Sequence, residues 1–198
     1  MQLLKAGVSK LDGVFYTHAH ADHVHGIDDL RSININTGKA LNVWGSKETL
    51  KLIENRFEYA FGIFCPHLSR PSLTSNVIRS GVMTRIANVD VTAFDQNHGK
   101  TTTTGYRFGD VAYSTDVKSF NLESFGFLKG LKLWIIDCVG YSEHPTHSHL
   151  ALTLEWIKRV RPERAILTHM SHQIEYEKLL AELPSNVAPG FDGLKIDI

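Results

Sequence analysis

Residues 17–26 read THAHADHVHG and hold four of the chain's eleven histidines. His18, His20, Asp22 and His23 are separated by one residue, then one, then none. Residues i and i+2 of an extended segment point to one side, whereas adjacent residues diverge. The spacing therefore predicts that His18 and His20 close on one metal ion. A turn between the two pairs then directs Asp22 and His23 to a second ion.

The sequence on either side of this cluster places it on a loop. GVFYT (13–17) is β-branched and aromatic, which is typical of a buried strand, and HGIDDL (25–30) reads as the start of a helix. The cluster thus follows the carboxyl end of a strand, where α/β proteins place their chemistry. This position favours a functional site over a structural one.

The composition is that of one globular domain. The chain has 198 residues, 42% of them apolar, and its 21 basic residues equal its 21 acidic ones. This balance argues against nucleic acid as a partner, because such proteins carry a basic surface. The sequence contains no stretch of about 18 apolar residues, which is the length needed to span a membrane. Two cysteines without a CxxC motif are typical of a reducing compartment, so we expect a soluble cytoplasmic protein.

Alternation and helical periodicity predict strands interleaved with helices, and a hairpin in the middle of the chain. Gly109-Asp110 forms the turn of that hairpin. We expect helices over 47–61, 150–160 and 174–183, the first capped by Ser46 and the second by Ser148 or Thr146. Residues 62–81 read as a loop, a candidate flap over the site. The expected strands are 13–17, 41–44, 89–94, 102–108, 111–115, 131–137, 164–168 and 193–198.

Five chemically capable residues share one position relative to these strands. His18, His98, Asp116, Asp137 and His169 each lie at or just past the carboxyl end of an expected strand. Because strand ends in one sheet face the same edge, these side chains can converge. Scattered core histidines have no reason to share that position.

The converging residues divide into two metal sites that share one carboxylate. Imidazole and carboxylate suit zinc, manganese or iron, and a site with a position open to water is catalytic. Two such ions ~3.5–4 Å apart activate a bridging water. The first site takes His18, His20 and His98, the second takes Asp22, His23 and His169, and Asp116 bridges both.

In this order the residues resemble the metal-binding motifs of the metallo-β-lactamase-fold hydrolases. HxHxDH matches residues 18–23, and the family's later histidine, bridging aspartate and final histidine match His98, Asp116 and His169. The resemblance implies an α/β fold, the αββα sandwich of that family, and two divalent metal ions, zinc or manganese. Aspartate at position 116 looks like the phosphodiesterase and glyoxalase branches and not like the main antibiotic-hydrolysing enzymes.

The second half of the chain is similar to one branch, the phosphoribosyl 1,2-cyclic phosphate phosphodiesterases. WIIDC, HPTHSHL, RAILTHMSH and PGFDGLKI carry this resemblance. It implies a catalytic histidine at His147, with His144 and His149 as neighbours that leave the alignment open. We expect Asp137 to orient a ligand histidine, and His149 and His172 are further candidates for supporting the ligands.

We therefore expect a dinuclear hydrolase that cleaves a small cyclic phosphodiester. A metal-bridging hydroxide would attack phosphorus, with Asp22 and His147 as catalytic residues. The alternatives are a nuclease of the tRNA 3′-processing type, which would need an arm and a basic surface not visible here, and a thiolester or lactone hydrolase. A metal-binding scaffold without activity is the alternative outside enzymes, and the complete ligand set argues against it.

The start of the chain differs from the family pattern. Only sixteen residues precede Thr17, and MQLLKAGVSKLDG reads as the end of a helix and a turn. The family places several strands there, without which the strand 13–17 keeps an unpaired edge. We expect residues 1–198 to be a single hydrolase domain, N-terminally truncated, with Met1 internal to a longer polypeptide. A minimal domain that covers the edge as a homodimer is the alternative.

Overall fold

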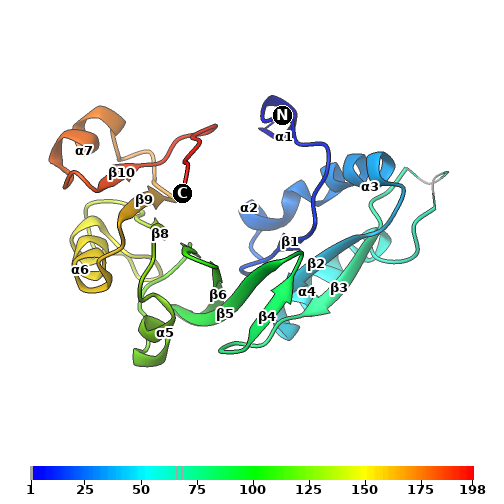
Figure 1. Ribbon diagram of the computed structural model, residues 1–198, viewed down its shortest axis with the longest axis horizontal. Helices are drawn as coiled ribbons and strands as arrows, with labels where there is room; N and C mark the ends of the chain where they lie inside the picture. The colour runs from blue at the N-terminus through cyan, green and yellow to red at the C-terminus, as the bar shows by residue number, and fades with distance from the viewer. Residues whose placement is uncertain (1, 66, 68) are drawn as a thin grey trace. The chain divides into compact units, whose positions relative to one another are not determined.

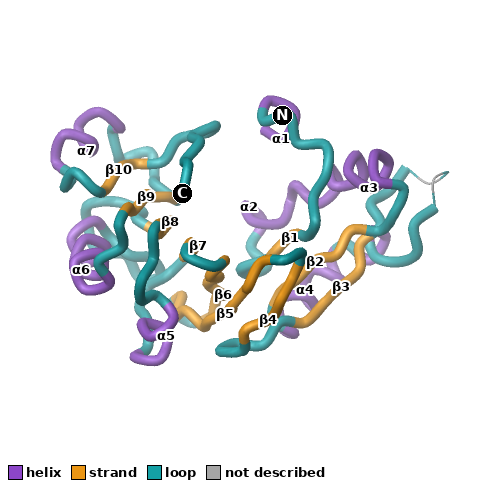
Figure 2. The backbone as a smooth tube through the Cα atoms, viewed as in Figure 1, coloured by secondary structure: helices purple, strands orange, loops and turns teal. Residues whose placement is uncertain are grey.

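A computed structural model describes residues 2–65, 67 and 69–198. The chain divides into two compact units, Met1–Arg79 and Ser80–Ile198. Each unit has its own β-sheet and its own cluster of buried apolar side chains. Figure 2 shows the helices and strands of both units.

The first unit is built on a three-stranded parallel sheet in the order β1-β2-β3 (Figure 1). Its buried side chains, Val43 and Ile53 among them, come from this sheet and from the helices around it. The elements are α1 Gln2–Lys5, β1 Val14–Phe15, α2 Ala21–Val24, the 3₁₀ segment His25–Leu30, α3 Arg31–Thr37, β2 Leu41–Gly45, α4 Lys47–Arg56, the 3₁₀ turn Glu58–Ala60 and β3 Leu73–Val77.

Helix α4 follows its sequence signals at the start and departs from them at the end. Ser46 caps it as predicted, because its hydroxyl accepts a hydrogen bond from the backbone N–H of Thr49 at 3.2 Å. The helix ends at Arg56, five residues before the predicted end, and Phe57 leaves helical geometry with φ −126°. Its buried face, Leu50 and Ile53, packs into the core of the first unit.

The prediction of a loop over residues 62–81 is wrong for part of that range. Residues Leu73–Val77 form β3, which pairs in parallel with β2 from Leu41↔Leu73 to Gly45↔Val77. The strand escapes detection because LTSNV is mostly polar and only its first residue is buried. The predicted flap includes residues 66 and 68, which lie outside the described residues.

The second unit is built on a seven-stranded mixed sheet in the order β10-β9-β8-β7-β6-β5-β4. β7 to β10 are parallel neighbours, and β4 to β7 alternate in direction, so β5, β7, β8 and β9 point the same way. The elements are β4 Met83–Ile86, β5 Val89–His98, β6 Thr101–Phe108, β7 Val111–Ser114, α5 Leu122–Phe127, β8 Leu133–Asp137, α6 Leu150–Val160, β9 Arg164–Thr168, α7 Tyr176–Glu182 and β10 Val187–Pro189.

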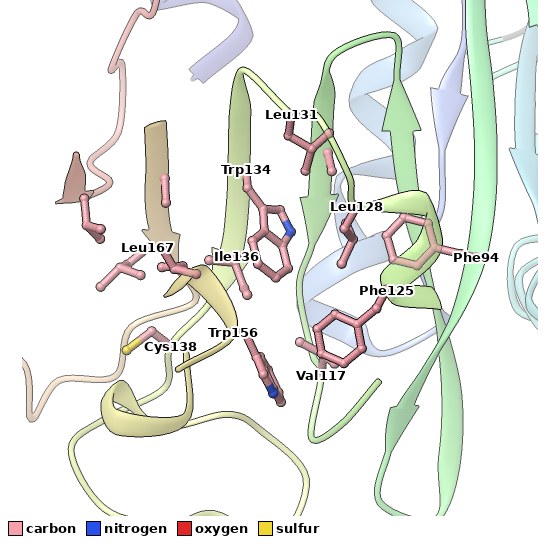
Figure 3. Packing of buried hydrophobic residues seen from close by; sticks show 14 of the residues in the cluster. Phe94, Val117, Phe125, Leu128, Leu131, Trp134, Ile136, Cys138, Trp156 and Leu167 are labelled. Atoms are coloured by element: carbon pink, nitrogen blue, oxygen red, sulfur yellow. The ribbon is translucent and has the colours of Figure 1, made fainter. Parts of the chain in front are cut away.

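Helices α5, α6 and α7 contribute to the core of the second unit. Alternate residues of β8 point to one face, so Trp134 and Ile136 pack there with Phe125 of α5 and Trp156 of α6 (Figure 3). Each such side chain contributes about 1.5–3 kcal/mol on burial. The Trp134 indole N–H donates to the Ser114 hydroxyl at 3.0 Å, which satisfies the one polar atom of that buried ring.

Two sequence predictions about the second unit are wrong. Neither Ser148 nor Thr146 caps α6, because His149 is the N-cap residue and its side chain makes no capping bond. The Ser148 hydroxyl donates instead to the backbone carbonyl of Asp137 at 2.7 Å. Residues 193–198 form no strand, because the place beside β9 is occupied by Val187–Pro189.

The remaining predicted strands are confirmed within a few residues, including the hairpin, whose register pairs Phe108 with Val111. In the part of the chain that the structure describes, β1 pairs on one side only, with β2. No helix among these residues is both long enough and apolar enough to cross a bilayer.

Gly105 in β6 gives a test of this packing. A Cβ atom there would lie 2.4 Å from the Phe94 ring and 2.5 Å from Gln96 Oε1. Gly105→Ala should therefore lower the free energy of unfolding by about 1–3 kcal/mol, measured by urea denaturation. Gly126→Ala is the control, because the space around Gly126 in α5 is open. It should be neutral or stabilising, and equal losses in both variants would contradict this account of β6.

Candidate metal centre

In the first unit, the histidine-rich stretch leaves β1 and turns directly into α2. His18 and His20 lie on the extended segment, and the ring nitrogens His18 Nε2 and His20 Nδ1 are 2.9 Å apart. Two nitrogen ligands of one tetrahedral zinc ion lie about 3.3 Å apart. Asp22 and His23 lie within the helical turn Ala21–Val24, with Asp22 Oδ2 at 3.2 Å from His23 Nε2. The predicted turn is thus present, and it separates the two pairs.

Arg56, the last residue of α4, fixes this stretch from outside. Its guanidinium donates a hydrogen bond to the backbone carbonyl of Ala19, between His18 and His20. The sequence carries no signal for this contact, because it joins two segments that are distant in the chain. The ligand loop is therefore held by a cation on a separate helix.

In the second unit, four of the predicted residues converge at one edge of the sheet. His98 ends β5, Asp116 follows β7, Asp137 ends β8 and His169 follows β9. These strands point the same way, so their carboxyl ends meet, as predicted. Asp116 and His169 have φ of 53° and 59°, in the left-handed region. Such non-glycine residues cost about 1–3 kcal/mol each and are concentrated at functional sites.

Asp116 lies at the centre of this edge. Its Oδ1 atom is 3.3 Å from Nε2 of His169, and its Oδ2 atom is 3.7 Å from Nε2 of His98 and 3.8 Å from Nε2 of His147. The Thr115 hydroxyl donates to Oδ1 at 2.8 Å and holds the carboxylate in place. Asp116 is 2% exposed, so its carboxylate is almost completely shielded from water.

For two of these imidazoles, the hydrogen-bond partner of Nδ1 identifies which ring nitrogen carries the proton. Nδ1 of His98 lies 2.8 Å from the Thr146 carbonyl, which can only accept, so Nδ1 is protonated. Nδ1 of His147 lies 3.0 Å from Asp137 Oδ2. Because the carboxylate oxygen accepts, this Nδ1 is protonated as well. Each Nε2 then presents a lone pair towards Asp116, the geometry of a metal-binding imidazole with a hydrogen-bonded outer nitrogen.

Asp137 is the buried support of this edge. It is fully buried, and its Oδ2 accepts from the backbone N–H of Val117 at 3.0 Å as well as from His147. Asp137 thus orients His147, which is not one of the predicted metal ligands, so the role predicted for it towards a ligand histidine stays a prediction. Oδ1 of Asp137 lies 3.9 Å from Nδ1 of His169 and, among the described residues, has no hydrogen-bond partner.

Gly99 permits the close approach of two loops at the site. Its φ is +72°, and a Cβ atom there would lie 2.8 Å from Cγ2 of Thr146. A side chain at position 99 would push away the segment that accepts the hydrogen bond of His98 and leads to His147. The absent side chain therefore sets the distance between these two histidines.

The other candidate histidines take different positions. His149 stands at the N-cap position of α6 without capping it, and its buried Nδ1 has no hydrogen-bond partner among the described residues. His172 is exposed. Sequence reasoning named His144 as a neighbour of His147 but missed Lys118, which contacts the same loop. The His144 ring is 5.0 Å from the His147 ring, and the Lys118 ammonium donates to the His144 carbonyl at 2.6 Å.

The donor set of the second unit fits a divalent metal ion. Asp116 and His169, two of the predicted ligands, each offer one ligand atom, and a ring nitrogen of His147 lies within 4.8 Å of both atoms. Imidazole nitrogens and carboxylate oxygens suit zinc and manganese. The neighbouring Cys138 thiol is not one of these atoms, and burial, followed by the nearby Asp137 charge, raises its pKa to about 12.

Comparison with known proteins identifies the family. A family model described as "Beta-lactamase superfamily domain" matches residues 1–170, so the chain belongs to this superfamily. This confirms the resemblance that the HxHxDH motif indicated. Among curated proteins, the chain is 32% identical over 196 residues to an octanoyltransferase of Porphyromonas gingivalis, covering 98% of this chain and 39% of that protein. It therefore spans about two fifths of that relative.

A second curated relative and the solved structures agree with this assignment. The chain is 44% identical over 48 residues to a ribonuclease Z of Methanococcus maripaludis, covering 23% of this chain and 16% of that protein. A crystal structure of a new diphosphatase from the PhnP family superposes with a TM-score of 0.88 at 28% identity, covering 99% of this chain and 75% of that one. The metallo-β-lactamase-fold protein YhfI of Bacillus subtilis superposes with a TM-score of 0.72 at 18% identity, over 93% and 76% of the two chains. The predicted fold class is confirmed.

Asp137 provides the test of this geometry. Asp137→Ala would leave the buried N–H groups of Val117 and His147 without their acceptor, so unfolding should become easier by at least about 2 kcal/mol. Chemical denaturation of the metal-free protein measures this loss without any contribution from bound ions. Asp95→Ala, on the exposed face of β5, is the matched control and should stay within about 0.5 kcal/mol of the parent. A neutral Asp137→Ala would show that the carboxylate is not the support described above.

Proposed function

We propose that this protein is a metal-dependent hydrolase of small phosphodiesters that works with two divalent ions, zinc or manganese. The observation that carries the proposal is the hydrogen-bonded pair of Asp137 and His147. It orients the His147 ring so that Nε2 faces the Asp116 carboxylate, as Nε2 of His169 also does. The proposed ligands are His18, His20, Asp22, His23, His98, Asp116 and His169.

Membership of the superfamily and the likeness to a diphosphatase support this activity. A diphosphatase and a ribonuclease both act at phosphorus, and both are similar to this chain. A small cyclic phosphodiester of the phosphoribosyl type is the substrate we propose, because the balanced charge of the chain does not favour a long polyanion. We propose a cytoplasmic enzyme.

The bound ions would supply Lewis acidity and a nucleophilic water at neutral pH. The chain's own residues then prepare the leaving group. Water oxygen forms a bond to phosphorus, the bond from phosphorus to the leaving oxygen breaks, and that oxygen needs a proton. His147 is the proposed donor: its Nε2 would take up the proton that the attacking water releases and pass it to the leaving oxygen. Asp137 keeps a proton on Nδ1 and stabilises the imidazolium while it exists, as a carboxylate does for a catalytic histidine.

Acyl transfer by the octanoyltransferase favours a thiolester as the second candidate substrate. A panel of substrates separates the two classes. Metal-reconstituted protein should hydrolyse bis-p-nitrophenyl phosphate and a ribose 1,2-cyclic phosphate faster than an octanoyl thiolester or a precursor tRNA. Protein with two bound metals that turns over neither phosphodiester would contradict the proposal. Faster hydrolysis of the thiolester than of the phosphodiesters would replace the proposed activity with thiolester hydrolysis.

Asp116→Ala tests the bridging carboxylate. It should reduce bound metal below two ions per chain, measured by elemental analysis after dialysis, and abolish hydrolysis. His25→Ala is the control, because His25 is exposed and is not among the proposed ligands. Asp116→Ala protein with two ions and a normal rate would show that another residue is the bridge.

His147→Ala tests chemistry separately from ligation. Loss of general acid assistance should lower kcat by about 10²–10⁴, while the metal content measured on the same sample stays unchanged. His149→Ala serves as the comparison. If His149→Ala gives this loss and His147→Ala does not, the catalytic histidine has been assigned to the wrong face of the loop.

A further inference from the structure

A buried glutamine on β5 is connected to the segment that carries Asp116, and the mechanism above gives it no role. Gln96 is almost completely buried, and its amide N–H groups donate to the Thr103 hydroxyl at 3.1 Å and to the Thr115 backbone carbonyl at 3.0 Å. A carbonyl oxygen can only accept, so the amide nitrogen, and not the amide oxygen, faces Thr115. Gln96 therefore joins β5 to β6 and to the segment that follows β7.

The two threonines that contact Gln96 each hold one part of Asp116. The Thr103 hydroxyl donates to the Asp116 backbone carbonyl at 2.9 Å, and the Thr115 hydroxyl donates to Oδ1 of the Asp116 side chain at 2.8 Å. Because Thr103 accepts from the amide, its single hydroxyl proton remains for Asp116. Gln96 thus holds the peptide group before Asp116 directly, and the peptide group after it through Thr103.

Asp116 needs such support because the backbone pairing between β6 and β7 ends before it. These strands pair from Phe108↔Val111 to Tyr106↔Tyr113, and Asp116 lies beyond the last pair. Its φ of 53° is in the left-handed region, which costs a residue with a side chain about 1–3 kcal/mol. Hydrogen bonds to the peptide groups on both sides of Asp116 can hold it in this conformation.

The amide is an unfavourable choice for the fold alone. Oε1 of Gln96 is buried and, in the part of the chain that the structure describes, has no hydrogen-bond partner. It fits because residue 105 is glycine, where a Cβ atom would lie 2.5 Å from Oε1. An unpartnered buried acceptor costs about 1–3 kcal/mol, which an apolar side chain of the same size would avoid. What the amide N–H groups hold therefore explains why a glutamine stands here.

We propose that Gln96 is a positioning residue of the metal centre, which acts through Thr103 and Thr115 to direct the Asp116 carboxylate at the three imidazoles around it. The carboxylate oxygens lie between 3.3 and 3.8 Å from those imidazole nitrogens, so a small rotation of Asp116 changes the arrangement of the ligand atoms. The inference rests on the proposed function only in that Asp116 binds metal, and it does not depend on which ester is cleaved.

Titration with Co²⁺ tests this role, because the visible absorption of bound Co²⁺ depends on the geometry of its ligands. Gln96→Met removes the amide donors at nearly constant volume. Compared with the parent, the metal-free variant should bind Co²⁺ about 10- to 100-fold more weakly, as is usual when a group that orients a ligand is lost. The spectrum of the loaded variant should also differ. Thr103→Val should have the same effects, and Thr103→Ser, which keeps the hydroxyl, should restore the parent's affinity.

Ile157→Val is the matched control, because it removes a methylene from the α6 side of the same core and lowers stability by about 0.5–1.5 kcal/mol. It should leave the affinity for Co²⁺ and the spectrum unchanged. Circular dichroism establishes that each protein is folded before titration, and the two Thr103 variants decide the question if Gln96→Met does not fold. Gln96→Met protein with reduced stability but with the parent's affinity and spectrum would overturn the proposal.

A double variant tests whether the glutamine acts through the threonine. If it does, Gln96→Met combined with Thr103→Val should weaken Co²⁺ binding by much less than the product of the two single losses. A loss equal to that product would contradict the connection through Thr103. Failure of the proposed activity is distinguishable, because binding is measured without substrate. If the parent hydrolyses neither phosphodiester but the variants show these losses, the activity is wrong and the positioning role stands.

Discussion

The buried carboxylate of Asp137 is the group on which the edge of the second unit depends. It lies at the end of β8, and one oxygen accepts from the backbone of the β7 loop and from His147. Its backbone carbonyl accepts from Ser148 and Thr153 at the start of α6. A single residue thus joins two strand ends to a helix. A buried charge of this kind persists only where donors surround it, so loop geometry and proton placement are fixed together.

The proposed ligands could be predicted because their order along the chain follows local rules. The period of two in an extended segment pairs His18 with His20, and strand ends in one direction bring His98, Asp116 and His169 to one edge. The hairpin could also be predicted, because its turn is indicated locally by Gly109-Asp110. Each of these signals lies within a few residues of the feature that it specifies.

The features that sequence could not supply are tertiary. β3 is short and polar, and it is a strand only because β2 offers it a parallel partner. The sequence predicts Ser148 as a helix cap, but its hydroxyl donates a hydrogen bond to the backbone carbonyl of Asp137 instead. Lys118 reaches a carbonyl 26 residues away, and Arg56 one 37 residues away. No local sequence pattern indicates such contacts, because the two residues of each contact are brought together only by the tertiary structure.

Gly99 has a consequence for how proteins with this edge can diverge. The position carries no chemical group, yet the room left by its missing side chain decides how near the loop of residues 145–147 comes to His98. A change there would alter catalysis without touching any reacting group. In a mutational survey, such a site would behave as a tuning position: intolerant like a catalytic residue, but for reasons of volume and backbone geometry alone.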